Sequence, residues 1–420
     1  MDCYPLDWES VTTFLHPPPT DPLFPNLRYL FCNVAAKSMP LLSMPFPSLV
    51  SLDLHFVDEV DWGHLRDSLE SVSRFSRNIK KLCVRARWQP ETTFCRFFSS
   101  YTSQWQNLQT LLCDDIALNM DALAHLSRMP ALTRLTFSVD GTLLRQIELS
   151  ASPLLFSNLC VFTLCSENLD PISRFLSRTR LLAVTDFTAS IKMCPSKLDI
   201  SSFFAGLQTS STGHIIQGLG LYQNLPSNDP YVPTDPRPVL TLEDLQPCMA
   251  FTNLCSMYLD IEWDVGLTGN DLLILASAWP QLEDLVVNED WGWSMLGGIS
   301  PNCLLQLLQT CRSLDRIALA IDTRGYTEFL SSSSSVALAL ETTFSIDVVD
   351  SAIQEESVAA MGSFFASIAP HPNFSFLAWA GLFREFDDEG RGLVYRDRWY
   401  AAYEQASDAI SKCAPLFPVR

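Results

Sequence analysis

The sequence predicts an α/β solenoid, an array of short parallel strands that alternate with helices. Three observations predict this class: a short apolar frame recurs along the chain, each copy ends in alternating apolar and variable positions, and helix start signals lie between copies. Hydrophobic residues make up 47% of the 420 residues and charged residues only 18%. Such a composition supports a large buried interior and excludes a mostly disordered chain.

The recurring frame consists of an aromatic residue, two small residues, Leu, two variable residues, and two apolar positions separated by one residue. Its clearest copies occupy residues 24–30, 46–54 and 156–164. Further copies begin at Ile79, Leu108, Leu132, Leu254, Leu282 and Leu314. Each copy ends in period-two alternation and therefore predicts a short strand with one buried face. Successive anchors lie roughly 22 to 32 residues apart where the copies are unbroken, close to the ~20 to 29 of leucine-rich repeats.

Helices are expected between the strands. Ser300 and Pro301 precede a run of Leu at helical spacing, and residues 268–271 precede a similar run. Residues 62–75 and 119–129 carry the same pattern. One strand and one helix per repeat predicts an irregular leucine-rich-repeat solenoid: a right-handed β-α superhelix with parallel concave strands and helices on the convex side.

The array is expected to fill most of the chain. Residues 1–22 are assigned to a lead-in, residues 23–375 to the solenoid and residues 376–420 to a capping segment. The frame spacing breaks in the middle, which predicts an irregular insertion over about 188–240 that includes five prolines after residue 223. Within this break, residues 180–187 and 213–222 could be two degenerate repeats with a helix over residues 199–207 between them. Because the exposed ends of a solenoid need covering, residues 399–413 are expected to pack over the last strand.

The charge balance narrows the expected partners. The 28 basic residues are outnumbered by 47 acidic residues, a formal charge of −19 that repels phosphate backbones and anionic lipids, so nucleic acid and membrane partners are not expected. No apolar run is long enough to span a bilayer, and the N-terminus lacks a signal peptide pattern. The 13 cysteines are odd in number and often lie in apolar runs, which favours a reducing compartment, cytoplasmic or nuclear.

No familiar catalytic motif was found, so no catalytic residue, cofactor or metal is predicted. The sequence lacks a phosphate-binding Gly-Lys loop, a Gly-x-Ser-x-Gly elbow, a His-Glu-x-x-His pair and a Cys-x-x-Cys pair. His55 and His64 could approach Cys83, but the six dispersed histidines favour surface or capping roles over a metal site. The sequence therefore predicts a non-enzymatic protein-interaction module. The alternative is a hydrolase or transferase whose site is assembled from dispersed Asp, His and Cys.

Candidate partner-binding residues follow from the strand alternation and from the tryptophans. Early strands present basic side chains, including Lys81 and Arg85, whereas the stretch from Arg237 to Arg312 contains ten carboxylates and no Lys or Arg between those two residues. This polarity favours a partner with a basic face, the alternative being that the charges only keep the protein soluble. The predicted partner-binding residues are Tyr29, Asp53, His55, Arg85, Trp88, Tyr258, Asp260, Glu262, Trp263, Asp284, Trp291 and Trp293.

The tryptophans allow two interpretations. Trp88, Trp263 and Trp291 each fall nine residues after the anchor of their repeat, just past the predicted strand. They are either exposed interface anchors on one edge of the solenoid or buried residues that close the turn between strand and helix, and the usual burial of Trp favours the second. Trp293, which follows Gly292, is expected to be the most exposed of the group.

The frame Phe-Pro-x-Leu resembles the repeat region of fungal, basidiomycete-type F-box/leucine-rich-repeat proteins. Residues 24–27 and 46–49 carry it best, and the C-terminal segment with Arg398 and Trp399 is similar to the one that closes those chains. The resemblance implies substrate recognition or scaffolding for a ubiquitin ligase. No F-box is visible before residue 24, so a ligase adaptor is expected as a partner only if an F-box is supplied upstream or in trans. The resemblance also leaves open a diverged remnant without ligase recruitment.

Overall fold

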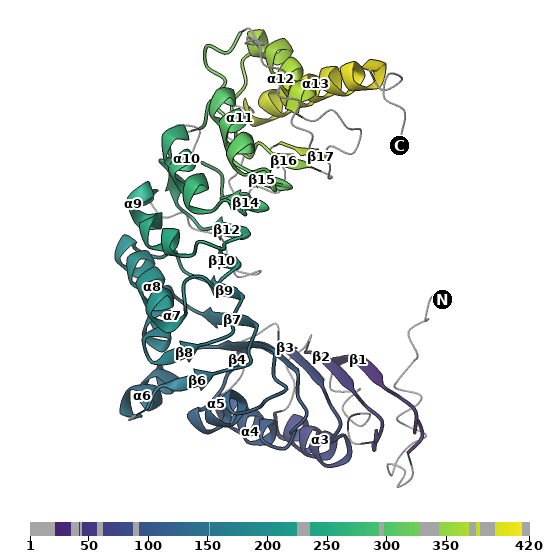
Figure 1. The fold of residues 1–420 in the computed structure, drawn as a ribbon. Coiled ribbons are helices and arrows are strands. Elements are labelled where there is room, and N and C mark those ends of the chain that lie inside the picture. The colour runs from purple at the N-terminus through teal and green to yellow at the C-terminus, as the bar shows by residue number, and fades with distance from the viewer. Residues whose placement is uncertain are drawn as a thin grey trace. The chain divides into compact units, whose positions relative to one another are not determined.

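The structure is a computed structural model in which the chain forms two compact units (Figure 1). One unit comprises residues 1–191 and 205–212, and the other comprises residues 192–204 and 213–420. The structure describes residues 22–34, 42, 44–56, 62–86, 92–150, 152–224, 236–293, 298–327, 344–368, 375–378 and 391–413.

The first unit is built on a parallel sheet whose strand order follows the chain. The strands are β1 (Tyr29–Val34), β2 (Ser51–Phe56), β3 (Lys81–Ala86), β4 (Thr110–Ala117), β5 (Arg134–Ser138), β7 (Val161–Ser166) and β9 (Asp186–Ile191). The helices between them are α3 (Trp62–Phe75), α4 (Thr92–Thr102), α5 (Met120–Ser127), α6 (Gly141–Leu149) and α7 (Leu169–Ser177). A second short sheet pairs β6 (Leu154–Phe156) with β8 (Thr179–Leu181).

The second unit repeats this plan. Its main strands are β10 (Gly218–Gln223), β12 (Ser256–Asp260), β14 (Asp284–Val287), β15 (Arg316–Ala318), β16 (Ser345–Asp347) and β17 (Ser375–Leu377). The helices are α9 (Leu242–Leu245), η2 (Gln246–Ala250), α10 (Gly269–Ala278), α11 (Pro301–Thr310), η3 (Glu355–Ser357), α12 (Val358–Ile368) and α13 (Arg391–Cys413). β11 (Val239–Leu240) pairs with β13 (Asp264–Val265), and α8 (Lys197–Ser210) has residues in both units.

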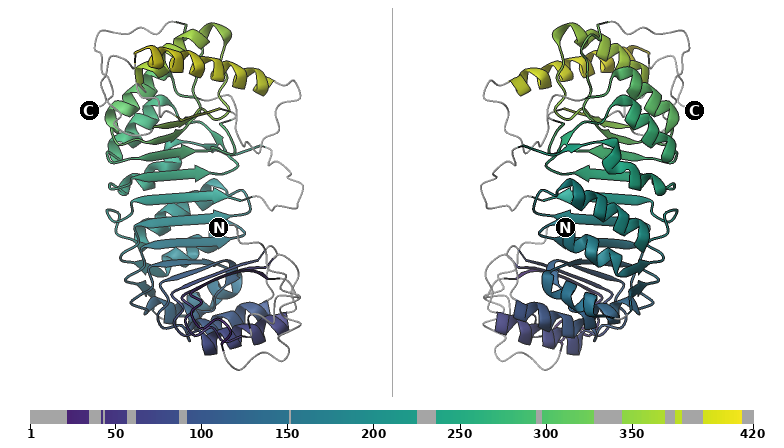
Figure 2. Two further views of the ribbon diagram at one scale, coloured as in Figure 1. Left: turned by 90° about the vertical axis from the view of Figure 1, so that its right-hand side faces the viewer. Right: turned by 90° about the vertical axis from the view of Figure 1, so that its left-hand side faces the viewer.

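Parallel strands alternating with helices confirm the predicted α/β solenoid class (Figure 2). The frame works because its Leu lies in the core, and its aromatic residue begins a turn just before the strand. The Leu49 amide donates to the Phe46 carbonyl at 3.2 Å, and Leu282 makes the same bond to Trp279 at 3.2 Å. All four side chains are buried, and each buried Leu contributes ~1.5 to 3 kcal/mol to folding.

The predicted helix start signals are present as hydrogen bonds. The Ser300 hydroxyl accepts from the Cys303 amide at 3.3 Å, directly before Pro301 at the first turn of α11. At α10, Thr268 and Asp271 form a reciprocal capping box. These helices lie on one face of the second unit's sheet (Figure 1). Strand alternation directs every second side chain toward the opposite face, which is called the open face below.

The predicted insertion over residues 188–240 is partly replaced by regular structure. Residues 188–223 contain the end of β9, all of α8 and β10, which together make a strand–helix–strand repeat. The repeat is degenerate there because β10 begins with Gly218, Leu219 and Gly220 in place of the usual Leu-rich pattern. Residues 225–235, which hold three of the five prolines after residue 223, lie outside the described residues.

The C-terminal helix covers the last strand of the second unit. Trp399 of α13 is fully buried, with its ring 6.3 Å from that of Phe376 in β17, and Tyr403 stacks on Phe376 at 5.3 Å. The Trp399 indole also donates to the Ser351 carbonyl at 3.0 Å. Trp399 and Tyr403 of the predicted capping segment therefore contact β17. No described helix is long and apolar enough to cross a membrane.

Candidate functional site

The candidate site lies on the open face of the second unit's sheet, opposite α10 and α11 (Figure 1). Strand register aligns alternate residues into rows on this face. One row contains Gly218, Ser256, Asp284, Arg316 and Ser345, and the next contains Gly220, Tyr258, Val286, Ala318 and Asp347. Tyr222 lies opposite Asp260 at the ends of β10 and β12.

Aromatic and acidic side chains gather on these rows. We call them the acidic-aromatic patch, defined as Tyr222, Tyr258, Asp260, Asp284, Glu289, Asp290, Arg316 and Asp347. Within this set five carboxyl groups face one guanidinium group. Asp284 is half-buried and accepts a hydrogen bond from the Ser256 hydroxyl at 2.9 Å. The patch therefore has an excess of negative charge that a basic partner could neutralise.

Arg316 shows how this patch holds a guanidinium group. One of its terminal nitrogens lies 2.7 and 2.6 Å from the two carboxylate oxygens of Glu289. The guanidinium carbon lies 5.7 Å from the centre of the Tyr258 ring, within range of a cation–π interaction. Tyr258 stacks in turn on Tyr222, with ring centres 6.2 Å apart. A ring and a carboxylate together therefore hold a partly exposed arginine in place.

Three carboxyl groups of the patch, those of Asp260, Asp290 and Asp347, have a pKa above the ordinary value because they are partly or fully buried. Burial raises the pKa of Asp260 to about 7, and the neighbouring charge of Asp290 adds to the rise. The Asp290 amide donates to Asp260 at 3.2 Å, which opposes the rise. Burial likewise raises the pKa of Asp347 to about 6, although the Val349 amide donates to it at 2.8 Å. A cation that approaches these groups favours their ionised form.

Two of the predicted acidic partner-binding residues are more buried than expected. Asp260 points to the open face, but the loop that carries Asp290 leaves it only 7% exposed. Glu262, which was expected on the same face, is 2% exposed and lies 3.5 Å from the Arg237 guanidinium. The reason is that β12 ends at Asp260, so the strand alternation no longer applies at residue 262. Glu262 is paired within the second unit and is not a surface acid.

The prediction that Trp293 is exposed is wrong. Trp263, Trp291 and Trp293 are all fully buried. The Trp293 indole donates to the Val287 carbonyl at 2.7 Å. Gly292 makes this possible, because its φ of 75° turns the chain inward and a Cβ there would lie 2.7 Å from an Asp350 carboxylate oxygen.

The tryptophans of the second unit therefore close the turn after the strand. The Trp263 indole donates to the Pro195 carbonyl at 2.9 Å, a bond that fixes this turn. None of the three can serve as a surface anchor in this structure. Trp88 lies outside the described residues.

The first unit carries the other predicted contacts on the open face of its sheet. Tyr29 and Phe31 of β1 are 72% and 61% exposed, and Arg85 of β3 is exposed as well. Asp53 and His55 are both half-buried on β2. The Phe31 ring meets the His55 ring edge to face, with centres 4.9 Å apart.

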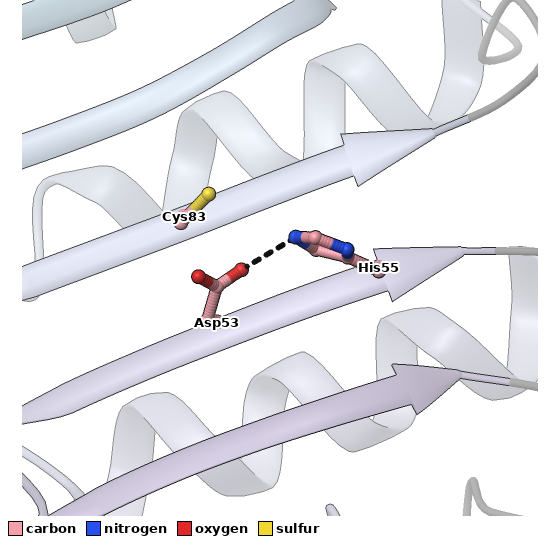
Figure 3. A group of neighbouring side chains, drawn as sticks. All are labelled: Asp53, His55 and Cys83. Carbon is pink, nitrogen blue, oxygen red and sulfur yellow. Dashed lines mark ion pairs between the residues drawn. The ribbon is translucent and has the colours of Figure 1, made fainter.

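Asp53, His55 and Cys83 form a compact cluster on this face (Figure 3). An Asp53 oxygen lies 3.0 Å from the His55 Nε2, and one ligand atom from each of the three residues lies within 4.8 Å of the others. Burial raises the pKa of Cys83 to about 12, helped by a hydrogen bond to Asp53. The expected approach of His55 and Cys83 is present, with Asp53 as the third member. The His64 side chain lies outside the described residues.

Sequence reasoning missed five members of the acidic-aromatic patch. Tyr222 and Arg316 carried a usable signal: Tyr222 ends an alternating Gly-x-Gly-x-Tyr run, and Arg316 occupies the frame position of Asp284. Glu289 and Asp290 follow Asn288, whose φ of 53° turns the chain back over β12, a geometry that strand periodicity does not predict. The fifth, Asp347, belongs to a repeat without a recognisable frame.

No protein-family model and no curated protein matches the chain. Among solved structures, it is similar to an internalin from Listeria monocytogenes at 13% identity, covering 89% of this chain and 79% of that one, with a TM-score of 0.36. It is also similar to the Rad7 and Elc1 complex of yeast at 14% identity, covering 71% and 77%, with a TM-score of 0.37. A Bacteroides fragilis protein matches at 13% identity over 70% and 76%, also with a TM-score of 0.37. At TM-scores this low the matches carry no functional inference, and the fold assignment rests on the strand order and register.

Proposed function

We propose that the protein is an interaction module whose acidic-aromatic patch binds an arginine-containing segment of a partner protein. Arg316, held between Tyr258 and Glu289, carries this proposal because it is an internal example of the contact. Tyr222 offers a second half-buried ring beside Tyr258, and Asp284 offers a half-buried carboxylate on β14. A partner arginine placed there would use the same two interactions.

The expected strength follows from these contacts. Hydrogen bonds to charged groups contribute about 1.5 to 3 kcal/mol each, and a cation–π contact adds ~0.5 to 2 kcal/mol. The half-buried position of Asp284 and Glu289 reduces solvent screening relative to a fully exposed acid. The overall charge of −19 steers a basic partner toward the protein at low salt. Two arginine contacts would therefore give measurable affinity that falls as salt increases.

The test uses a fluorescein-labelled peptide of alternating Arg and Ser, with a Glu-Ser peptide as the reversed-charge probe. Fluorescence anisotropy compares the wild-type chain with an Asp284→Asn/Asp290→Asn double variant. Asp186→Asn is the matched control, because Asp186 is an exposed acid at the start of β9 in the first unit. The double variant should bind the Arg-Ser peptide at least about 10-fold more weakly, and Asp186→Asn should bind it normally. Equal losses in both variants, or equal binding of the Glu-Ser peptide, would contradict the proposal.

A narrower proposal follows from the resemblance to F-box repeat proteins. In it, the acidic-aromatic patch selects substrates for a ubiquitin ligase, and the adaptor contact is supplied by an F-box upstream or in trans. Affinity purification of the tagged chain, with mass spectrometry of ligase subunits, tests this link. The Asp284→Asn/Asp290→Asn variant should recover adaptor and cullin subunits at the wild-type level but lose other partners. That result would support the ligase link. Failure to recover ligase subunits from either chain would limit the function to binding alone.

A further inference from the structure

We propose that Asp53, His55 and Cys83 bind one zinc ion on the open face of the first unit. A carboxylate oxygen, an imidazole nitrogen and a thiol sulfur are the three donor types that zinc takes from proteins. Strand alternation places Asp53 and His55 on the same face of β2, and register places Cys83 of β3 directly beside Asp53. Their ligand atoms converge within 4.8 Å (Figure 3).

The hydrogen bonding of the cluster leaves room for a cation. The Asp53 Oδ1 and the His55 Nε2 form an ion pair at 3.0 Å. Apart from this contact, neither buried atom has a hydrogen-bond partner. A metal ion beside the pair would take the remaining lone pair of the carboxylate oxygen and the lone pair of the neutral imidazole.

The spacing suits a tetrahedral ion after small side-chain rotations. Zinc bonds of about 2.0 to 2.3 Å place two tetrahedral ligand atoms roughly 3.3 to 3.7 Å apart. The Asp53–His55 distance of 3.0 Å is slightly shorter than this range, and the 4.8 Å limit of the cluster is longer. The Phe31 ring contacts the His55 imidazole from one side and restricts its rotation. Three protein ligands leave the fourth position to water or to a partner's side chain.

The donor set selects the metal. Calcium and magnesium prefer all-oxygen sites, whereas a thiolate with an imidazole favours zinc. Zinc binding displaces the Cys83 thiol proton to solvent, and the two anionic ligands then balance the ion's charge. Arg85, which lies opposite His55 in register, opposes binding by its positive charge, and the carboxylate of Asp114 on β4 partly compensates for it.

The cluster also differs from a cysteine–histidine nucleophile. In such a pair the imidazole takes the thiol proton directly. Here the His55 Nε2 faces Asp53, and Cys83 hydrogen-bonds to Asp53 as well. Asp53 therefore interacts with both other groups, and His55 and Cys83 do not form a direct proton-transfer pair.

Cobalt substitution tests the proposal on the full-length chain, reduced and freed of metal with EDTA. Co²⁺ alone is titrated, with the visible tetrahedral bands and the thiolate-to-cobalt ultraviolet band as readouts, and Zn²⁺ is then added to displace it. The wild-type chain should bind one equivalent with both signals. Cys160→Ser is the matched control, since Cys160 is a half-buried cysteine outside the cluster, and it should bind identically.

Three variants remove ligands. Cys83→Ser should abolish the thiolate band, and His55→Gln and Asp53→Asn should each weaken zinc binding by at least about 100-fold, more than the usual loss of a supporting hydrogen bond. Circular dichroism monitors folding. If buried Cys83 does not tolerate serine, the two half-buried positions decide the result. Absence of a cobalt signal in the wild-type chain, or unchanged binding by His55→Gln and Asp53→Asn, would overturn the proposal by assigning any metal to other thiols.

Discussion

Replacement of Trp293 by Phe tests whether the tryptophans of the second unit belong to the core. Trp293 is fully buried, and its indole nitrogen donates to the Val287 carbonyl at 2.7 Å. Phe keeps an aromatic ring in the site but has no donor and a smaller volume. The substitution therefore removes one buried hydrogen bond and leaves a small cavity without changing charge.

The expected cost follows from these two losses. A buried carbonyl left without its donor costs about 1 to 3 kcal/mol. The missing ring atoms add a cavity term, so the total decrease in the free energy of unfolding should be about 2 to 4 kcal/mol. An exposed tryptophan in contact with solvent would lose less than about 0.5 kcal/mol on the same change.

Urea unfolding followed by far-ultraviolet circular dichroism measures this difference. Leu149→Ala is the control, because Leu149 is 88% exposed at the end of α6 and its loss should change stability by less than about 0.5 kcal/mol. A Trp293→Phe variant as stable as the control would refute the buried assignment. Such a result would indicate that Trp293 is exposed, as the sequence pattern predicts.

Three further predictions follow. The pKa of Asp260 is raised from 3.8 to about 7, so the folded state holds this proton more tightly than the unfolded state does. Stability should therefore fall as pH rises from about 4 to about 7, with no further effect of this group above that range. Asp260→Asn should reduce this decline in the urea midpoint, and an unchanged pH profile would contradict the assignment. Asn288→Gly keeps a residue that tolerates the φ of 53° but removes a side-chain amide that accepts from the Ile261 amide at 3.1 Å and donates to the Trp263 carbonyl at 2.7 Å. The free energy of unfolding in urea should fall by about 2 to 4 kcal/mol, and a loss below about 0.5 kcal/mol would contradict this role. Trp399→Ala should cost about 3 to 5 kcal/mol and promote association in size-exclusion chromatography because it uncovers Phe376, whereas a stable monomer would argue against capping by α13.

The strand and helix plan could be predicted from sequence because its signals are local. The Leu of each frame and the turn that precedes it lie within a few residues, as Phe46 and Leu49 show, and Ser300 caps its own helix. Strand alternation also placed Tyr258 and Asp284 on the open face correctly. These features depend on periodicity and on short-range hydrogen bonds, which a single sequence contains.

The details of the candidate site depend on residues that are distant in the chain. Asp260 is buried by a loop 30 residues later, and Trp293 is held by Asp350, whose carboxylate accepts from its amide at 2.7 Å. The inward turn requires the positive φ of Gly292, which composition alone does not reveal. The cluster of Asp53 and Cys83 likewise depends on the register of β2 against β3. Local patterns could not predict these contacts.

The most direct measurement of partner binding is the position of its contact on the protein. An Arg-Ser peptide that carries a photo-crosslinking residue is bound to the wild-type chain, irradiated and mapped by mass spectrometry. Crosslinks should fall on β10, β12, β14 and the segment that follows β14, at residues 218–223, 256–260 and 284–290. Crosslinks confined to β1–β3 of the first unit, or to helices α10 and α11, would contradict binding at the acidic-aromatic patch.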